Sequence, residues 1–305
     1  MTQCSITSPL MRTTAFSFHN LAHEEQHLGV GDNESPDMST TGAIPPEVIS
    51  MIQSQLDAIE RSHSVRILFA IESGSRAWGF PSPNSDYDVR FVYVHDAAWY
   101  LSIDARRDVI ELPIEGDLDI NGWDLRKALF LLLKPNPVLL EWLSSPIVYR
   151  SDPAVMWRMA ELGKRTAHRR PSTYHYLNLA DSQFRRFIGK MDEVPLKKYF
   201  YALRPALALA WLRAHPDEPV PMALPALRAG LDLPSGLDAF VDDLLARKAR
   251  TRELGDGPRV PALDTFIQAE ILEARKLVQE PPPKSSGLLE TANELFRDLV
   301  RGAPA

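Results

Sequence analysis

The chain has very little cysteine, because Cys4 is its only one in 305 residues. This count excludes a disulfide framework and a multi-cysteine zinc site, and it fits a reducing compartment. Long apolar runs are also missing, since no stretch approaches the roughly 18 residues that a membrane helix needs. The N-terminus lacks the short basic and then apolar pattern of a signal peptide. We therefore expect an intracellular, cytoplasmic protein without a membrane span.

Strong net charge is absent too, but the formal value of -6 hides two opposite segments. Residues 1–50 carry six acidic side chains against the single Arg12. Residues 161–204 carry ten Lys and Arg side chains against four acidic ones. The basic segment is the part that suits a polyanion, whereas the negative total disfavours tight, non-specific binding of nucleic acid.

Composition and periodicity divide the chain into four parts. Residues 1–43 are polar without periodicity, which predicts a disordered acidic leader. Residues 44–150 mix helical and strand patterns and form the predicted catalytic domain, whereas residues 151–280 are almost wholly helical. Residues 281–305 contain a proline-rich linker and a final amphipathic helix that could either pack back or stay separate. The predicted strands span 65–71, 88–94, 108–114 and 117–120. The predicted helices of the C-terminal half span 153–168, 172–189, 195–214, 221–230, 235–250 and 261–279.

Asp86 and Asp88 lie at the start of a strand that is otherwise apolar. Residues i and i+2 of a strand point to the same side, so these carboxylates would stand a few ångströms apart. Like charges this close repel unless a cation lies between them, and oxygen ligands suit Mg²⁺ or Mn²⁺. Taken alone the motif is weak, because a polar turn and an ion pair with Arg90 explain it equally simply.

Gly74-Ser75 lies between this strand and the preceding one, and Ser75 precedes Asp86 by eleven residues. Backbone N–H groups at such a turn form an anion site, and glycine allows a phosphate to come close. The Ser75 hydroxyl adds a donor and Arg76 adds charge. An ordinary strand-to-helix turn is the alternative for this pattern alone.

A third carboxylate, Asp119, lies between apolar residues on a later predicted strand and could complete a metal site. Two metal ions held by three carboxylates, with phosphates bound opposite, suit an in-line phosphoryl displacement. Asp117 is a weaker rival for this role. Asp124 directly precedes a helical run, which favours a helix N-cap. Glu72 is a possible supporting group, and Arg90 could contact phosphate or form a salt bridge that organises the site.

These motifs carry a family resemblance, which runs from about residue 65 to 150 and less securely through the later stretches "HYLNLADSQFRRF" and "LKKYFYALRPALALAWL". The segments "ESGSRAWGF", "SDYDVRFVYV" and "LDINGWDLRKALF" resemble the DNA polymerase β-type nucleotidyltransferase superfamily. Within it, they are most similar to a bacterial branch of nucleotidyltransferases linked to RNA repair. The resemblance implies an α+β fold, with a polymerase β-like domain of mixed sheet and helices, then an all-helical C-terminal domain closing the nucleotide cleft.

The resemblance also implies roles for individual residues. Asp86, Asp88 and Asp119 would hold two Mg²⁺ or Mn²⁺ ions, and Gly74 and Ser75 would bind the β- and γ-phosphates of a nucleoside triphosphate. An acceptor hydroxyl would attack the α-phosphorus and release pyrophosphate. The acceptor would most plausibly be an RNA 3′ end. Nucleotidylation of a protein or small molecule, and a silent nucleotide-binding regulator, are the alternatives.

One predicted helix in the C-terminal half could complete the nucleotide site. Lys197, Lys198, Tyr201 and Arg204 recur at spacings that place several of them on one face. The cations would neutralise a triphosphate, and Tyr201 would stack on a base or sugar. A solvated basic face above a buried aromatic ring is the alternative.

Other basic and aromatic residues in this half are ambiguous. His175 and Tyr176 could reach the same cleft or simply pack in the core, and Arg185-Arg186 could contact an acceptor or form a solvated surface.

Overall fold

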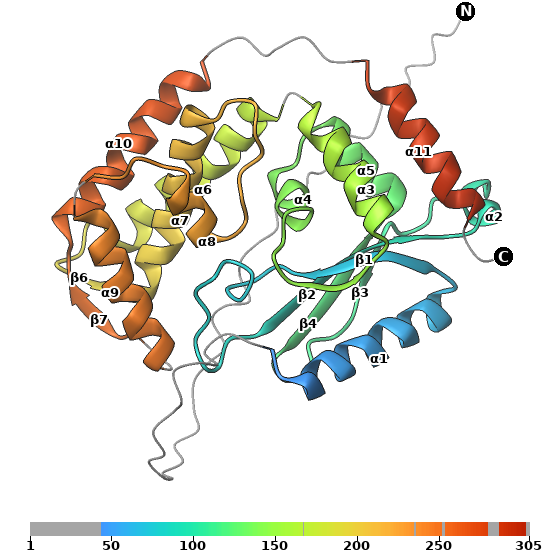
Figure 1. The fold of residues 1–305 in the computed structure, drawn as a ribbon, viewed down its shortest axis with the longest axis horizontal. Coiled ribbons are helices and arrows are strands. Elements are labelled where there is room, and N and C mark those ends of the chain that lie inside the picture. The colour runs from blue at the N-terminus through green and yellow to red at the C-terminus, as the bar shows by residue number, and fades with distance from the viewer. Residues whose placement is uncertain (1–43, 167, 235, 252–253, 280–286, 303–305) are drawn as a thin grey trace, which may run out of the picture. The chain divides into compact units, whose positions relative to one another are not determined.

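The computed structural model describes residues 44–166, 168–234, 236–251, 254–279 and 287–302 (Figure 1). The leader predicted at 1–43 and most of the predicted proline-rich linker lie outside these residues.

Within the described residues, a five-stranded mixed sheet occupies the N-terminal half (Figure 1). Its strands are β1 (Arg66–Glu72), β2 (Tyr87–Val94), β3 (Val109–Glu111), β4 (Leu118–Asp124) and β5 (Val148–Ser151). They lie in the order β3-β4-β2-β1-β5. β2 and β4 run parallel, and the other neighbouring pairs are antiparallel. The mixed sheet with helices confirms the α+β class.

Helices cover both faces of the sheet, which explains why its central strands are apolar runs rather than alternating patterns. On one face, α1 (Pro46–His63) buries Leu56 and its helical neighbours against β1, β2 and β4. The other face carries α3 (Leu125–Leu133), α4 (Pro137–Trp142) and α5 (Pro153–Lys164) (Figure 1). On this face Trp123 of β4 stacks on Trp142 of α4, with ring centroids 4.1 Å apart.

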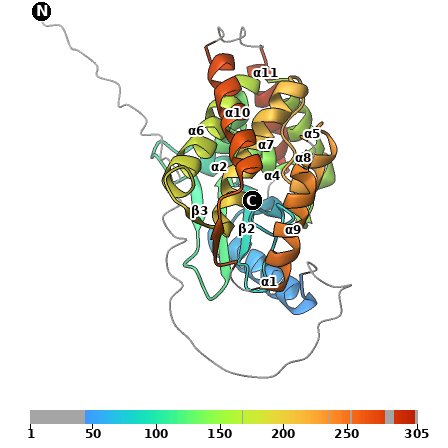
Figure 2. The same cartoon turned by 90° about the vertical axis from the view of Figure 1, so that its left-hand side faces the viewer.

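The C-terminal region is helical and is organised around α7 (Leu196–Ala214), which is buried along most of its length. It packs against α6 (Arg169–Phe187) and α10 (Pro261–Leu277), which also contact each other (Figure 2). The remaining described elements here are α8 (Leu224–Ala229), α9 (Leu237–Arg250) and a two-stranded antiparallel sheet of β6 (Glu193–Pro195) with β7 (Asp256–Pro258).

The final helix, α11 (Leu289–Arg301), packs back onto the N-terminal half. Leu295 and Leu299 join the apolar cluster of α3 and α5. The Phe296 ring meets the edge of Tyr100 in the short α2 (Ala97–Tyr100), with centroids 4.9 Å apart. Since α5 and α11 share the core of the sheet, that core extends beyond the domain boundary expected at residue 150.

Strand bounds differ most from expectation at β3 and β4. β4 is longer than the predicted 117–120, because it pairs with β2 as far as Asp124. β3 is shorter than the predicted 108–114, and its pairing with β4 ends at Glu111. Pro113 lies just beyond, and a proline has no N–H to donate to a ladder.

The packing of α11 leads to a stability prediction. Leu295→Ala should lower the free energy of unfolding by about 2–4 kcal/mol, because it leaves a cavity in the core. Leu289→Ala is the matched control, since Leu289 lies on the same helix and is 59% exposed. Denaturant unfolding monitored by tryptophan fluorescence measures both. Equal small effects would mean that α11 is not part of the core.

Candidate active site

The loop after β1 brings Gly74 against Asp88 of β2. A Cβ atom at position 74 would lie 1.9 Å from Asp88 Oδ2, so only glycine fits there. The Gly74 N–H donates to Glu72 Oε1 at 3.2 Å and is therefore already bonded within the protein. Gly74 thus allows a close approach between two chain segments, which differs from the phosphate-donor role expected from the sequence.

The rest of this loop is held by Ser85 and its neighbours. Ser75 Oγ donates to Ser85 Oγ at 2.9 Å. Arg76 donates to the backbone oxygens of Ser85 at 2.6 Å and Asp86 at 3.2 Å, and its guanidinium lies over the Tyr87 ring. These contacts fix Ser75 and Arg76 beside the paired aspartates.

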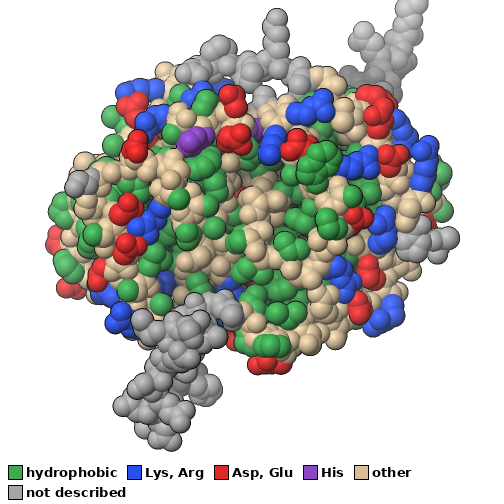
Figure 3. Space-filling model, in the orientation of Figure 1, with side chains coloured by type: hydrophobic (Ala, Val, Ile, Leu, Met, Phe, Trp, Pro, Cys, Tyr) green, Lys and Arg blue, Asp and Glu red, His purple; other side chains and the backbone are tan. Residues whose placement is uncertain are grey.

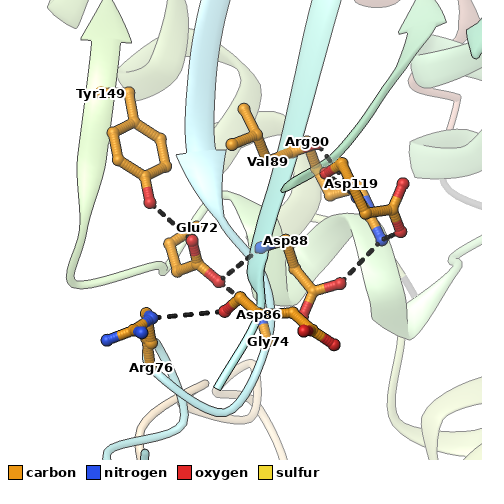
Figure 4. Close-up of polar contacts among 9 residues, drawn as sticks. All are labelled: Glu72, Gly74, Arg76, Asp86, Asp88, Val89, Arg90, Asp119 and Tyr149. Atoms are coloured by element: carbon orange, nitrogen blue, oxygen red, sulfur yellow. Dashed lines mark hydrogen bonds and ion pairs between the residues drawn. The ribbon is translucent and has the colours of Figure 1, made fainter. Parts of the chain in front are cut away.

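The predicted carboxylates converge from two parallel strands. Asp88 of β2 is the direct register partner of Asp119 of β4. Asp86 lies exposed just before β2, and its side chain is drawn beside Asp88 in Figure 4. The structure therefore brings the three predicted residues to one end of the β2–β4 pair.

Arg90 bridges two of these carboxylates. Its Nη2 donates to Asp88 Oδ1 at 3.1 Å and to Asp119 Oδ2 at 2.7 Å (Figure 4). Its Nη1 donates to the backbone oxygens of Val89 and Asp119. The sequence left open whether Arg90 contacts phosphate or forms a salt bridge that organises the site. The structure shows the salt bridge.

Glu72 supports Asp88 from the opposite side (Figure 4). It is fully buried, and its Oε1 accepts the backbone N–H of Asp88 at 3.0 Å as well as that of Gly74. Tyr149 of β5 donates its hydroxyl to Glu72 Oε2 at 2.6 Å. Tyr149 was not among the sequence candidates, because nothing near it in the chain marks a tyrosine that reaches a carboxylate of the neighbouring strand.

The carboxylates carry perturbed pKa values. Burial raises the pKa of Asp88, and Arg90 lowers it, while Asp119 raises it further. Burial likewise raises the pKa of Glu72, against the hydrogen bond from Tyr149. Because the net pKa shift of Asp88 is upward, Arg90 only partly offsets the free-energy cost of keeping that charge in place.

The two rival aspartates have different surroundings. Asp124 is the N-cap of α3, as predicted, since its Oδ1 accepts the Arg126 N–H at 2.8 Å. Its other oxygen accepts the Tyr100 hydroxyl at 2.6 Å. Asp117 is exposed and precedes β4.

On α7, the four predicted residues have different surroundings. Lys197 is exposed, and Lys198 lies over the Tyr201 ring at 5.3 Å. Tyr201 meets the ring edge of Trp78 from the Gly74 loop, with centroids 6.3 Å apart. Burial, followed by the charges of Asp88 and Asp86, raises the pKa of Tyr201 to about 12. Tyr201 therefore links α7 to the aspartates.

Arg204 is instead committed to a buried network. It is 5% exposed, pairs with Glu141 at 2.9 Å and donates to the Met222 backbone oxygen at 2.9 Å. Its guanidinium also lies over the Trp78 ring. These contacts hold Nε and Nη2 of Arg204 within the protein, and its expected nucleotide-binding role stays a prediction.

Glu141 also accepts the hydroxyl of Tyr176, which is fully buried on α6. Tyr176 is thus a core residue. Burial also affects the neighbouring His175, whose pKa it lowers. Sequence reasoning missed Glu141, because it stands within an apolar helix and its partners lie more than thirty residues away.

Comparison with known proteins identifies the family. The model of the RNA repair pathway DNA polymerase beta family matches residues 48–298. The chain belongs to this family. It is therefore a nucleotidyltransferase of the polymerase β type, as the Gly-Ser and Asp-x-Asp motifs indicate.

Two known proteins are similar to this chain. YcgL, an uncharacterized protein of Bacillus subtilis, is 43% identical over 249 residues, which cover 82% of this chain and 95% of that protein. A nucleotidyltransferase-like protein from Exiguobacterium sibiricum, known from a crystal structure, is 11% identical and has a TM-score of 0.25. It covers 83% of this chain and 81% of its own, but a TM-score this low carries no argument.

Across the described ranges of this polymerase β family member, no helix is long and apolar enough to cross a membrane.

The close approach at Gly74 gives a functional prediction. Gly74→Ala should lower any nucleotidyl transfer by about 100-fold or more, because the new Cβ must displace the Asp88 carboxylate. Circular dichroism should show an intact fold. Gly287→Ala is the control, since nothing lies within 4 Å of its added Cβ. Full activity in Gly74→Ala would show that the position of Asp88 is not critical.

The raised pKa of Asp88 gives a second prediction. A carboxyl whose folded pKa exceeds its unfolded pKa stabilises the fold at low pH and loses that contribution as pH rises through the folded pKa. Without divalent cations, Asp88→Asn should therefore raise the Tm more at pH 8 than at pH 4. Thermal melts in chelator measure this, with Asp117→Asn as the exposed control. A lower Tm of Asp88→Asn at pH 8 would mean that the attraction to Arg90 dominates.

Proposed function

We propose that this protein is a Mg²⁺-dependent enzyme that transfers a nucleoside monophosphate from a triphosphate to an RNA 3′ hydroxyl, releasing pyrophosphate. The observation that carries the proposal is the pairing of Asp88 with Asp119 in the β2–β4 register, with Asp86 beside them. The family description, an RNA repair pathway, supports RNA as the acceptor.

The donor set fits a hard divalent cation. It consists of carboxylate oxygens, which suit Mg²⁺ or Mn²⁺. Burial raises the pKa of Asp88 despite the attraction of Arg90, so a further cation at this place would help to keep the carboxylate charged. In the described parts of the chain, no three His, Cys, Asp or Glu side chains yet converge as a metal site. Arg90 lies between two of the carboxylates, so they would have to turn from it toward an ion.

In this proposal, each residue of the candidate site has a role in binding the metal ions or the triphosphate. Asp86, Asp88 and Asp119 would hold two ions, which supply charge stabilisation at the phosphates and a more nucleophilic hydroxyl. Ser75 and Arg76 would bind the β- and γ-phosphates, together with Lys197 and Lys198 from the facing helix.

Three other residues would shape the site rather than carry charge to the phosphates. Gly74 would keep Asp88 in place, Tyr201 would stack on the base or sugar, and Arg204 would hold Trp78 and thereby the loop.

Charge on the surface limits how RNA would bind. On the face drawn in Figure 3, basic and acidic side chains are interspersed rather than gathered by sign. Many simultaneous phosphate contacts need an extended basic surface. We therefore expect this enzyme to hold a short stretch near the RNA end, and to add single nucleotides rather than to copy a template.

The direct test labels the acceptor. Purified protein is incubated with Mg²⁺, cellular RNA and each of the four α-labelled ribonucleoside triphosphates. Label should appear on RNA from at least one triphosphate. It should fall by at least about 1000-fold in Asp119→Asn, because charge stabilisation at the reacting phosphate is usually the largest contribution to catalysis. The Asp86→Asn/Asp88→Asn double variant should be equally inactive.

Asp117→Asn is the matched control, two residues before Asp119 on the exposed side, and should keep its activity. Label on protein instead of RNA would mean that the acceptor is a protein side chain, with the same nucleotidyl transfer chemistry. Retained activity in Asp119→Asn would refute the carboxylate assignment.

A further inference from the structure

Four cations gather on the helical side of the Gly74 loop, and aromatic rings hold three of them. We call Arg186, Lys197, Lys198 and Lys248 the basic cluster. Arg186 and Lys198 lie over the same Phe187 ring, at 5.0 and 4.5 Å from its centroid. The Lys248 ammonium of α9 lies 4.7 Å from the centroid of the Phe80 ring and 5.6 Å from that of Phe200.

Within the described ranges, the basic cluster has no acidic salt-bridge partner. Among the described residues, none of its four members forms a salt bridge with a carboxylate, although the adjacent Arg185 and Arg247 do. Burial, then repulsion from Lys197, lowers the pKa of Lys248 to about 8. Burial also lowers the pKa of Lys198, followed by repulsion from Lys197 and Arg186. The cluster therefore holds more positive charge than its surroundings balance.

Lys248 is the most unusual member, because it is only 4% exposed. A buried ammonium normally has a carboxylate partner, since its removal from water costs free energy. The rings of Phe80 and Phe200 offset part of that cost through cation–π attraction. A buried cation with no anion among the described residues is typical of a site whose anion comes from a ligand.

The position of the basic cluster connects it with the reaction. Phe80 belongs to the loop that begins with Gly74-Ser75, and its ring stacks on Phe200 of α7 with centroids 4.9 Å apart. Lys198 lies over Tyr201, whose pKa responds to Asp86 and Asp88. No aspartate of the active site contributes to the pKa of Lys248. The basic cluster therefore lies beside Tyr201, and the charges of Asp86 and Asp88 are not among the causes of the pKa shift of its buried member, Lys248.

We propose that the basic cluster is an anion site that binds a terminal, dianionic phosphate and has Lys248 as its buried member. A terminal phosphate carries close to two charges, which matches several cations better than a single phosphodiester does. The phosphate is either the last one of a triphosphate or the end phosphate of an RNA. The choice between these two phosphates rests on the proposed function, whereas the existence of the site does not.

The test measures binding without catalysis. The full chain in chelator is titrated in a calorimeter with inorganic tripolyphosphate, ATP and AMP, and with an RNA octamer bearing a 5′-phosphate, a 3′-phosphate or neither. Lys248→Met keeps an unbranched side chain, one heavy atom shorter, and removes the charge. It should weaken at least one probe with a terminal phosphate by about tenfold or more, because a charge-assisted contact is lost.

Arg247→Met is the matched control, with the same charge change one residue earlier on an exposed face. It should leave all affinities unchanged. Weaker binding of tripolyphosphate and ATP, but not AMP, would assign the cluster to the triphosphate. Weaker binding of a phosphorylated octamer alone would assign it to the acceptor. Unchanged affinity for every probe would overturn the proposal.

Thermal melting separates this role from a structural one. If Lys248 serves a ligand, Lys248→Met removes a buried charge and should raise the Tm. A lower Tm with unchanged affinities would mean that the ammonium only stabilises the aromatic core, and would overturn the proposal. If Lys248→Met does not fold, the exposed Lys197→Met should still weaken the same probe several-fold. The Asp86→Asn/Asp88→Asn variant should retain this phosphate binding. An error in the carboxylate assignment can therefore be told apart from an error in the assignment of the basic cluster.

Discussion

The parallel pairing of β2 with β4 is the constraint on which the site depends. It places Asp88 directly opposite Asp119, so that two carboxylates from segments thirty residues apart meet at one end of the sheet. Arg90 lies between them and forms an ion pair with each, but burial still leaves the pKa of Asp88 raised. Keeping that carboxylate charged therefore costs free energy that an uncharged side chain at position 88 would not cost.

The surrounding structure keeps this unfavourable arrangement in place. Glu72 accepts the backbone N–H groups of Gly74 and Asp88, and Tyr149 fixes the other oxygen of Glu72. On the far side of the same loop, Arg204 lies over Trp78 and is itself paired with Glu141. The helical half thus acts on the loop that touches Asp88. Sites held from both sides in this way keep reacting groups in position without the help of substrate.

Sequence reasoning predicted the parts of this site that follow from local pattern. The strand that begins next to Asp86 and bears Asp88, the lone Asp119 and the Asp124 N-cap were each predicted from residues near each other in the chain. The register that pairs Asp88 with Asp119 could not be predicted, because strand pairing is a non-local property. Arg204 shows the same limit. Its helical spacing suggested a cleft residue, whereas its partners Glu141 and Met222 come from other segments and bury it. The packing of α11 onto the sheet, left open by its amphipathic pattern, was decided by apolar partners on α3 and α5.

The most direct measurement is anomalous diffraction from crystals grown with Mn²⁺ and a triphosphate that cannot be hydrolysed at its α-phosphorus. The account predicts manganese peaks within coordination distance of Asp86, Asp88 and Asp119, with Arg90 released from at least one of its two carboxylates. Manganese bound away from these residues, with Arg90 still bridging Asp88 and Asp119 beside an ordered triphosphate, would contradict it.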